Sequence, residues 1–354
     1  MRKLDEHGRM AAMILNAITD LVGVELADLQ VSPDASMRAD LIVSVPSIGQ
    51  AFVVEFRKTT SAASIAAAAK QVKEISLRTK RQSIPIVAVP FMGEVGKKAC
   101  AEKGVGWFDL SGNARITAQG IRIVIEGKPN RFISAGRPPN LFAPKSSRIA
   151  RWLLENPGDS FSQKELSLAT GLDQGFVSRL ITRLVSEEYI TRTGNGAVRV
   201  KDFALLLDTW REGYRFSNHT LLKGYVAARS GDALLRFTAD VLGEMNTDYA
   251  VTGLSAAWLL TRFASFRIAT LYLRGSLTPE LSERLRFRSD PRGANLWLAF
   301  PNDDGVFHGA TRRDGINCVH PVQAYVDLKD HPERAEEASE RLRTELLSWE
   351  SDEG

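Results

Sequence analysis

A run of basic and polar side chains between residues 174 and 183 carries the most specific chemistry in this chain of 354 residues. Arg179 and Arg183 are spaced so that a helix presents both of them on one face. A guanidinium group donates paired hydrogen bonds to phosphate oxygens or to the acceptor edge of guanine, and hydroxyl and amide groups can bond to bases or phosphates. The face expected to make such contacts consists of Gln174, Ser178, Arg179, Thr182 and Arg183.

Three predicted helices followed by a hairpin position these side chains, and they span residues 146–155, 162–170, 174–188 and 189–200. Ser162 and Glu165 have the spacing of a capping box, which starts the second helix. Gly171 supplies the left-handed turn that ends this helix, and Asp173 caps the third. The hairpin turns at Gly194-Asn195-Gly196. This order of elements predicts a winged helix-turn-helix.

The predicted hairpin would form the wing beside the third helix. A helix that follows a tight turn fits the major groove of DNA, with its first turns at the base edges. The wing offers Arg192, Asn195 and Arg199 to the DNA backbone or the minor groove. We therefore expect double-stranded DNA as the partner, bound by a homodimer, because one recognition helix rarely covers enough bases. The alternative is a small domain that docks another protein.

A linker rich in Pro, Gly and Ser precedes this domain, and we expect it to be extended. Between residues 127 and 151 the chain has six Lys or Arg residues and no acid. The sequence Gly136-Arg137-Pro138 resembles the core of an AT-hook, which lays an arginine along a narrow minor groove. The basic residues of this region that we include among the expected DNA contacts are Arg137, Lys145 and Arg148. A plain solvated linker is the alternative.

The composition is that of a globular protein with two or three domains. A net charge of +4 is compatible with a nucleic-acid partner without requiring one. The two cysteines, Cys100 and Cys318, lie in apolar segments far apart, so we expect reduced core thiols and no structural zinc. No stretch has the apolar length of a membrane span, and Asp20 and Glu25 interrupt any signal-peptide core. We expect a cytoplasmic protein with no membrane partner.

Strands and helices alternate in the first third of the chain, over residues 10–24, 40–45, 51–57, 61–80, 85–89, 95–103 and 106–110. This alternation predicts an α/β domain. Asp40 and Glu55 fall on adjacent strands, and Arg57 follows Glu55 by two positions. Paired carboxylates suit Mg²⁺, which takes oxygen ligands and keeps water for attack on a phosphodiester.

The spacing Asp40…Glu55-x-Arg57 resembles the core of the PD-(D/E)XK nuclease fold. This resemblance implies a divalent metal between the two carboxylates and a role for Gln71 near the phosphate. Arg57 stands where the family has a lysine, and arginine stays protonated, so it can bind phosphate but cannot act as a base. We expect a nuclease-like fold without cleavage activity or cofactor, kept for DNA contact or dimerisation. The alternatives are a Mg²⁺-dependent endonuclease targeted by the winged helix, and an α/β domain whose carboxylates are merely solvated.

The segment Phe108 to Ile116 follows. Asp109 and Asn113 bracket a predicted turn at Gly112. The segment also resembles a recurrent strand-end segment of bacterial regulators that carry a nuclease-like domain ahead of a winged helix.

The last third of the chain predicts a separate α/β domain that begins near Arg229. A strand followed by Gly253-Leu254-Ser255 and a helix is similar to the opening of nucleotidyltransferase-like domains. Those enzymes need two aspartates on the next strand, but residues 269–273 contain no carboxylate. Asp303 and Asp304 lie in a predicted turn, where we interpret them as turn formers. Nucleotide transfer is therefore not expected.

A segment near the C-terminus, His320 to Lys329 with Pro332 to Ala335, resembles type IV toxin–antitoxin AbiEi-family proteins. Antitoxins of that family repress their own operon, and a cognate toxin or another protein could dock on this domain. A further alternative function is therefore that of an antitoxin that neutralises a partner toxin. Gln323, Tyr325 and Asp327 either bind a partner or form a helix cap and packing set. A final helix is predicted over 332–349.

The fold class that we expect is a multidomain combination of α/β and α+β. It has a restriction-endonuclease-like domain over 1–126, a linker over 127–144, a winged helix over 145–215 and a nucleotidyltransferase-like domain over 229–354. The expected function is that of a sequence-specific DNA-binding transcriptional regulator.

Overall fold

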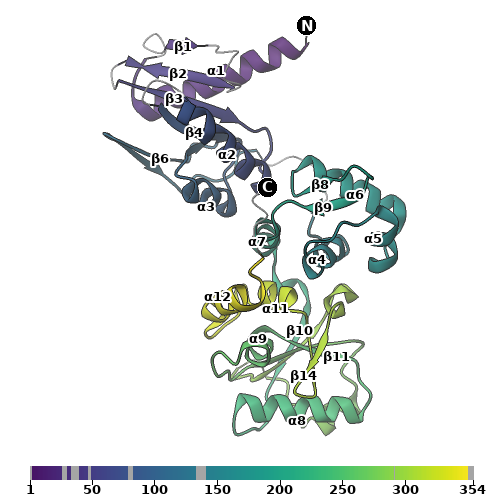
Figure 1. Ribbon diagram of the computed structural model, residues 1–354. Helices are drawn as coiled ribbons and strands as arrows, with labels where there is room; N and C mark the ends of the chain where they lie inside the picture. Colours follow the sequence, from purple (N-terminus) through teal and green to yellow (C-terminus); the bar gives the residue numbers. More distant parts are fainter. Residues whose placement is uncertain are drawn as a thin grey trace. The chain divides into compact units, whose positions relative to one another are not determined.

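A computed structural model of the chain describes residues 2–25, 30–32, 40–46, 49–78, 83–132, 141–290 and 292–349. The chain forms two compact units, which Figure 1 shows in ribbon form. The N-terminal unit is Met1–Pro138 with Ser186–Tyr189, and the C-terminal unit is Pro139–Val185 with Ile190–Gly354. The predicted mixture of helices and sheets in several domains is confirmed. In the described part of the chain, no helix combines the length and apolarity of a membrane span.

A seven-stranded sheet in the order β1-β2-β3-β4-β5-β6-β7 forms the centre of the N-terminal unit. The elements are α1 (Arg2–Val22), β1 (Gln30–Ser32), β2 (Leu41–Val45), β3 (Gln50–Phe56), α2 (Ala62–Arg78), β4 (Ser83–Val89), α3 (Glu94–Glu102), β5 (Gly106–Asp109), β6 (Ala114–Ala118) and β7 (Ile121–Ile125). Strands β3, β4 and β5 are parallel, and the remaining pairs are antiparallel. Helices α2 and α3 are the crossovers that parallel pairing requires.

Helices cover both faces of this sheet. On one face, Ile14 and Ile18 of α1 pack in a cluster with Phe52. On the other face, Ile65 of α2 packs in a cluster with Trp107. Because successive strand residues point to opposite faces, the nearly continuous apolar run of β3 supplies both clusters.

A buried polar clamp closes the turn between β5 and β6, as the sequence predicts. The Asp109 carboxylate accepts hydrogen bonds from the backbone N–H (2.9 Å) and the side-chain amide (2.9 Å) of Asn113, and from Met92 N–H (3.2 Å). The Asn113 amide also bonds the N–H and C=O groups of Lys128, at 2.8 and 3.0 Å. Residues of the predicted linker are thus fastened to this unit.

The C-terminal unit begins with the winged helix, in the predicted order. Its elements are α4 (Ser147–Glu155), α5 (Gln163–Thr170), α6 (Gln174–Ser186), β8 (Ile190–Arg192) and β9 (Val198–Val200). The capping box of Ser162 and Glu165 is present, and Gly171 adopts a left-handed φ of 65°. Phe161 forms an isolated antiparallel bridge to Val198 at the edge of the two-stranded β8–β9 hairpin.

A six-stranded sheet in the order β10-β13-β12-β11-β15-β14 follows in the same unit. Its strands are β10 (Thr220–Gly224), β11 (Tyr249–Thr252), β12 (Ala269–Leu273), β13 (Leu296–Phe300), β14 (Thr311–Arg313) and β15 (Ile316–Cys318). The helices are α7 (Phe203–Gly213), η3 (Phe216–Asn218), α8 (Gly231–Glu244), α9 (Gly253–Thr261), α10 (Pro279–Arg284), η4 (Asp304–Phe307), α11 (Pro321–Asp327) and α12 (Ala335–Leu346). Helix α9 packs against both α11 and α12.

Three expectations differ from the structure. The sheet domain starts at β10, ahead of residue 229, because this half-buried strand pairs with the distant β13. A helix, α11, precedes the predicted final one; His320 caps it and Pro321 occupies its first turn. The predicted extended linker ends in turns over residues 141–146, where Leu141 is buried. Arg137 lies outside the described residues.

The Asp109–Asn113 clamp generates a stability prediction. Asn113→Ala removes the side-chain donor to the buried Asp109 carboxylate and both hydrogen bonds to the Lys128 backbone, while the backbone N–H of residue 113 remains. The local opening free energy should therefore fall by about 1–3 kcal/mol. Hydrogen–deuterium exchange across residues 106–118 should accelerate roughly tenfold or more. Thr117→Ala, at an exposed position of β6, is the matched control. Equal acceleration in both variants would contradict a specific role for the clamp.

Candidate nucleic-acid interface

Helix α6 separates an apolar side from a polar side. Val177, Leu180, Ile181 and Leu184 are buried. The polar side chains predicted from sequence all belong to the other side: Gln174, Arg179 and Thr182 are exposed, and Ser178 and Arg183 are half-buried. The structure therefore brings these five together along one helix face, with hydrogen-bonding groups that suit base edges and phosphates.

The turn between α5 and α6 stabilises the N-terminal end of α6. The Asp173 carboxylate accepts a hydrogen bond from the Phe176 N–H at 3.0 Å, which satisfies a free donor of the first turn. Lys145, from the turn before α4, lies with its ammonium 5.7 Å from the centre of the Phe176 ring. Lys145 is exposed and adjoins the start of α6.

The wing presents the other predicted contacts. Arg192 is exposed and Arg199 is half-buried on the paired strands β8 and β9. The Asn195 side-chain oxygen accepts from the Thr193 hydroxyl (2.5 Å) and from Ala197 N–H (3.1 Å), so it stabilises the turn. The predicted Gly-Asn-Gly turn is confirmed, with Gly196 at a φ of 81°.

Arg148, which the sequence predicts as a DNA contact, makes its hydrogen bonds within the C-terminal unit. Its Nε and Nη2 donate to the Asp303 carboxylate at 2.8 and 2.9 Å, and its Nη1 donates to the Thr170 carbonyl at 3.1 Å. All of its nitrogens are used within the C-terminal unit, where it joins α4, the end of α5 and the loop before η4. Asp303 also accepts from Gly305 N–H at 2.8 Å, which confirms its predicted role in a turn.

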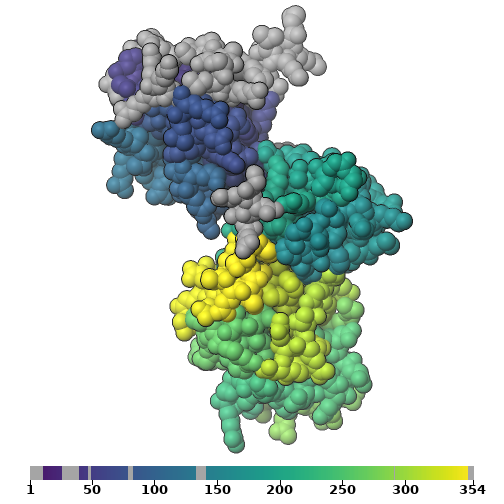
Figure 2. Space-filling view, in the orientation of Figure 1, coloured from purple at the N-terminus to yellow at the C-terminus, as the bar shows by residue number. Residues whose placement is uncertain are grey.

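A buried polar network fixes α4 to the sheet domain, and Figure 2 shows the continuous surface that the two form. Arg151 of α4 is 3% exposed. Its Nε and Nη2 donate to the Gln323 side-chain oxygen at 3.1 and 2.6 Å, and the Gln323 amide donates to Asp327 at 2.8 Å. The guanidinium also lies 5.0 Å from the centre of the Trp210 ring. A buried cation and a buried carboxylate are thus joined through one amide.

Asp327 is fully buried and has further donors around it. Thr252 Oγ1 and Tyr272 OH donate to its oxygens at 2.5 and 2.9 Å, and Tyr214 OH donates as well. Burial raises the pKa of Asp327 to about 6, although the hydrogen bonds act in the opposite direction. Burial lowers the pKa of the neighbouring His219 to about 4, with Arg151 contributing to the same shift.

This network decides between the two interpretations of the segment from His320 onward. Gln323 and Asp327 are inaccessible to solvent and Tyr325 is 7% exposed, so they form a packing set inside the unit. Sequence reasoning did not assign a role to Arg151. The available signal was the spacing of Arg148, Arg151 and Glu155, which places three charged residues on one side of α4. The Glu155 carboxylate contacts His308 Nδ1 at 2.5 Å.

The residues predicted for a nuclease site also lie close together, in the N-terminal unit. Arg57 Nη1 donates to the Glu55 carboxylate at 2.5 Å, and Nη2 donates to the Gln71 side-chain oxygen at 3.0 Å. Asp40 accepts from Phe56 N–H at 2.8 Å. Burial raises the pKa of Glu55, while Arg57 opposes this shift. Among the residues with a described placement, no group of three or more His, Cys, Asp or Glu is arranged to hold a metal.

The opening of α9 has a structural role. Ser255 Oγ donates to the Thr252 carbonyl at 2.8 Å and accepts from Thr270 N–H at 3.1 Å, which joins α9 to β11 and β12. Every residue of β12 is buried, and Tyr272 points into the Asp327 network. The side chains of β12 therefore belong to the core of the sheet domain.

Comparison with known proteins supports the central domain. Residues 142–199 match the family model of the MarR family. Neither a curated protein nor a solved structure matches this chain. The match covers α4, α5, α6 and the hairpin up to residue 199, so this central domain is a winged helix similar to that of the MarR family.

The Arg151 network predicts a large stability effect. Gln323→Leu leaves a buried guanidinium without its main acceptor, and breaking a buried charge network costs about 3–5 kcal/mol. Thermal unfolding of the C-terminal unit should shift downward by roughly 6–20 °C. The control is Gln163→Leu at a partly exposed position of α5, measured by scanning calorimetry. An equal melting temperature for the wild type and Gln323→Leu would contradict the role given to the network.

Proposed function

We propose that this protein is a sequence-specific DNA-binding transcriptional regulator that reads DNA through α6 and the wing. The observation that carries the proposal is the polar face of α6, which lies on the element that winged helices place in the major groove. Exposed Arg179 and Arg192 supply positive charge on the recognition helix and on the wing. Phosphate contacts would set the register, and base-edge contacts from Arg179 and Gln174 would give specificity.

We further propose that the regulator binds as a homodimer. One recognition helix reads only a few base pairs, and two copies related by a twofold axis would read two half-sites about one helical turn apart. The resemblance to AbiEi-family antitoxins supports regulation of the protein's own operon. Because Gln323 and Asp327 are buried, any toxin that docked on the sheet domain would use other residues.

The N-terminal unit, in this proposal, contributes a nuclease-like fold without cleavage activity. Arg57 donates hydrogen bonds to both Glu55 and Gln71. Its guanidinium group therefore lies beside the carboxylate that would bind a metal in an active nuclease, at the position of the basic lysine. This arrangement favours phosphate contact over hydrolysis.

The DNA-reading role of α6 predicts a specific loss on substitution. Arg179→Ala should weaken binding to the protein's own upstream DNA by roughly 5- to 150-fold, since one base-directed arginine contributes about 1–3 kcal/mol. Fluorescence anisotropy at fixed salt measures this change. Arg292→Ala removes the same charge from an exposed loop of the sheet domain and should leave the affinity unchanged. If Arg179→Ala bound as tightly as the wild type, the winged helix would not be the reading element.

The proposed lack of cleavage is tested with supercoiled plasmid and the upstream fragment. Incubation with Mg²⁺ or Mn²⁺ should leave both DNAs intact, because Arg57 already neutralises Glu55 and cannot act as a base. Glu55→Ala should bind the fragment as the wild type does. Metal-dependent cutting that disappears in Asp40→Ala would establish an endonuclease instead.

A further inference from the structure

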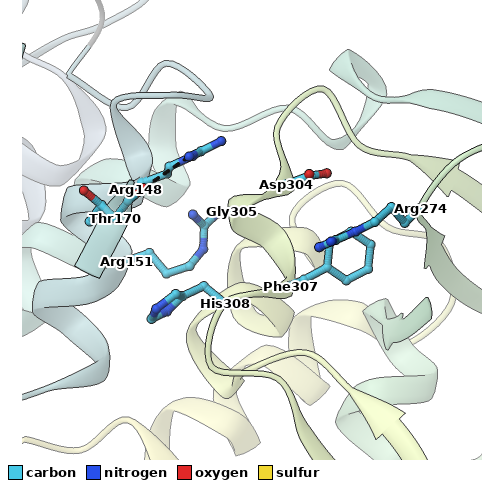
Figure 3. A pocket seen from close by; sticks show the side chains of 8 residues that line it. All are labelled: Arg148, Arg151, Thr170, Arg274, Asp304, Gly305, Phe307 and His308. Atoms are coloured by element: carbon cyan, nitrogen blue, oxygen red, sulfur yellow. Dashed lines mark hydrogen bonds between the residues drawn. The ribbon is translucent and has the colours of Figure 1, made fainter. Parts of the chain in front are cut away.

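A cavity of about 260 Å³ lies within the C-terminal unit, between the winged helix and the sheet domain. Figure 3 shows Arg148, Arg151 and Thr170 on one side of it and Arg274 with Phe307 on the other. The cavity belongs neither to the exposed face of α6 nor to the Asp40 and Glu55 cluster. Its volume suits a small ligand.

Arg151 brings an unused donor to this cavity. Its Nε and Nη2 bond Gln323, but its Nη1 is buried and has no hydrogen-bond partner among the described residues. A Cβ atom built at residue 305 would lie 2.7 Å from this nitrogen, so Gly305 leaves it space. Leaving a buried guanidinium nitrogen without an acceptor is costly, and an oxygen of a bound ligand would satisfy it.

The other lining residues make the cavity positive. Arg274 follows β12, is half-exposed, and stacks on Phe307 with its guanidinium carbon 4.8 Å from the ring centre. Its contact with the Asp248 carboxylate is long, at 3.9 Å. Three arginines line the cavity, against the carboxylate of Asp304 and that of Asp303, which bonds Arg148 beside it. Guanidinium groups form paired, charge-assisted bonds with oxyanions, and several of them together suit the multiple charge of a phosphate.

We propose that this cavity binds a small phosphate-type oxyanion, either free or carried by a small metabolite, and that its occupancy weakens DNA binding. The site itself is argued from Arg151, Arg274 and the cavity. The effect on DNA rests on the proposed function.

In this proposal, Arg148 links anion binding in the cavity to DNA binding by α6. This residue bonds the Thr170 carbonyl at the end of α5 and the Asp303 carboxylate beside the cavity. Thr170 directly precedes Gly171, the turn that places α6. An anion in the cavity competes with Asp303 for Arg148, and a shift of that guanidinium removes a contact from the turn. Only a ligand with different affinity for the two arrangements can shift their populations.

Calorimetry with inorganic phosphate, at constant ionic strength, tests the site on the full chain without DNA. Wild-type protein should bind saturably, and Arg274→Gln should raise Kd at least about tenfold, because it removes a charged donor without touching the buried network. Arg284→Gln, on exposed α10, loses the same charge and should bind as the wild type. Absence of saturable binding, or equal binding by Arg274→Gln, would overturn the site. Tighter binding of glycerol phosphate than of inorganic phosphate would identify an esterified ligand.

The DNA effect is tested by adding saturating phosphate to the anisotropy assay, with ionic strength held by chloride. DNA affinity of the wild type should fall severalfold, and that of Arg274→Gln should not change. Unchanged wild-type affinity would overturn the regulatory part of the proposal. If the protein bound no DNA at all, the proposed function would fail while calorimetry still decided the anion site.

Discussion

A guanidinium group removed from water must find its acceptors inside the protein, and Arg151 imposes that requirement on the C-terminal unit. The Gln323 side-chain oxygen accepts hydrogen bonds from two of the three guanidinium nitrogens, and its amide nitrogen donates to Asp327. The cost of burying the Asp327 carboxylate is offset by the hydroxyl donors of Thr252, Tyr214 and Tyr272. Gln323 and Asp327 share helix α11, while Arg151, Tyr214, Thr252 and Tyr272 come from other parts of the chain. The position of α4 relative to β11, β12 and α11 therefore depends on a single connected set of hydrogen bonds.

The same helix performs two tasks with two sets of residues. Its apolar residues Ile149, Ala150, Leu153 and Leu154 are buried, as the core of the unit requires. Its charged residues Arg148, Arg151 and Glu155 contact the loop around η4 and α11. An amphipathic helix of a free domain would turn such charges toward water. Here they face another domain, and the loop that receives them also lines the arginine-rich cavity.

Local signals made the winged helix predictable from sequence. Three of these signals depend only on residues close together in the sequence: the capping box at Ser162, the turn at Gly171 and the Gly-Asn-Gly hairpin. They can therefore be recognised without knowing the fold. What sequence reasoning missed depends on distant partners. Strand β10 is defined by β13, and the ion pair of Arg148 with Asp303 joins residues far apart in the sequence. The polar face of α6 was predicted as a set because its members share one helix, whereas the role of Arg151 requires Gln323 from far along the chain.

The match to the MarR family ends at residue 199, but the physical unit does not. A fragment cut at that boundary would keep every recognition side chain of α6 and the wing. It would also expose to solvent the charged side of α4 and strip Arg151 of both Gln323 and Trp210. The matched segment therefore depends on the sheet domain for the partners of Arg151. A chimera that transfers this winged helix to another protein would therefore also need Gln323, the acceptor for Arg151.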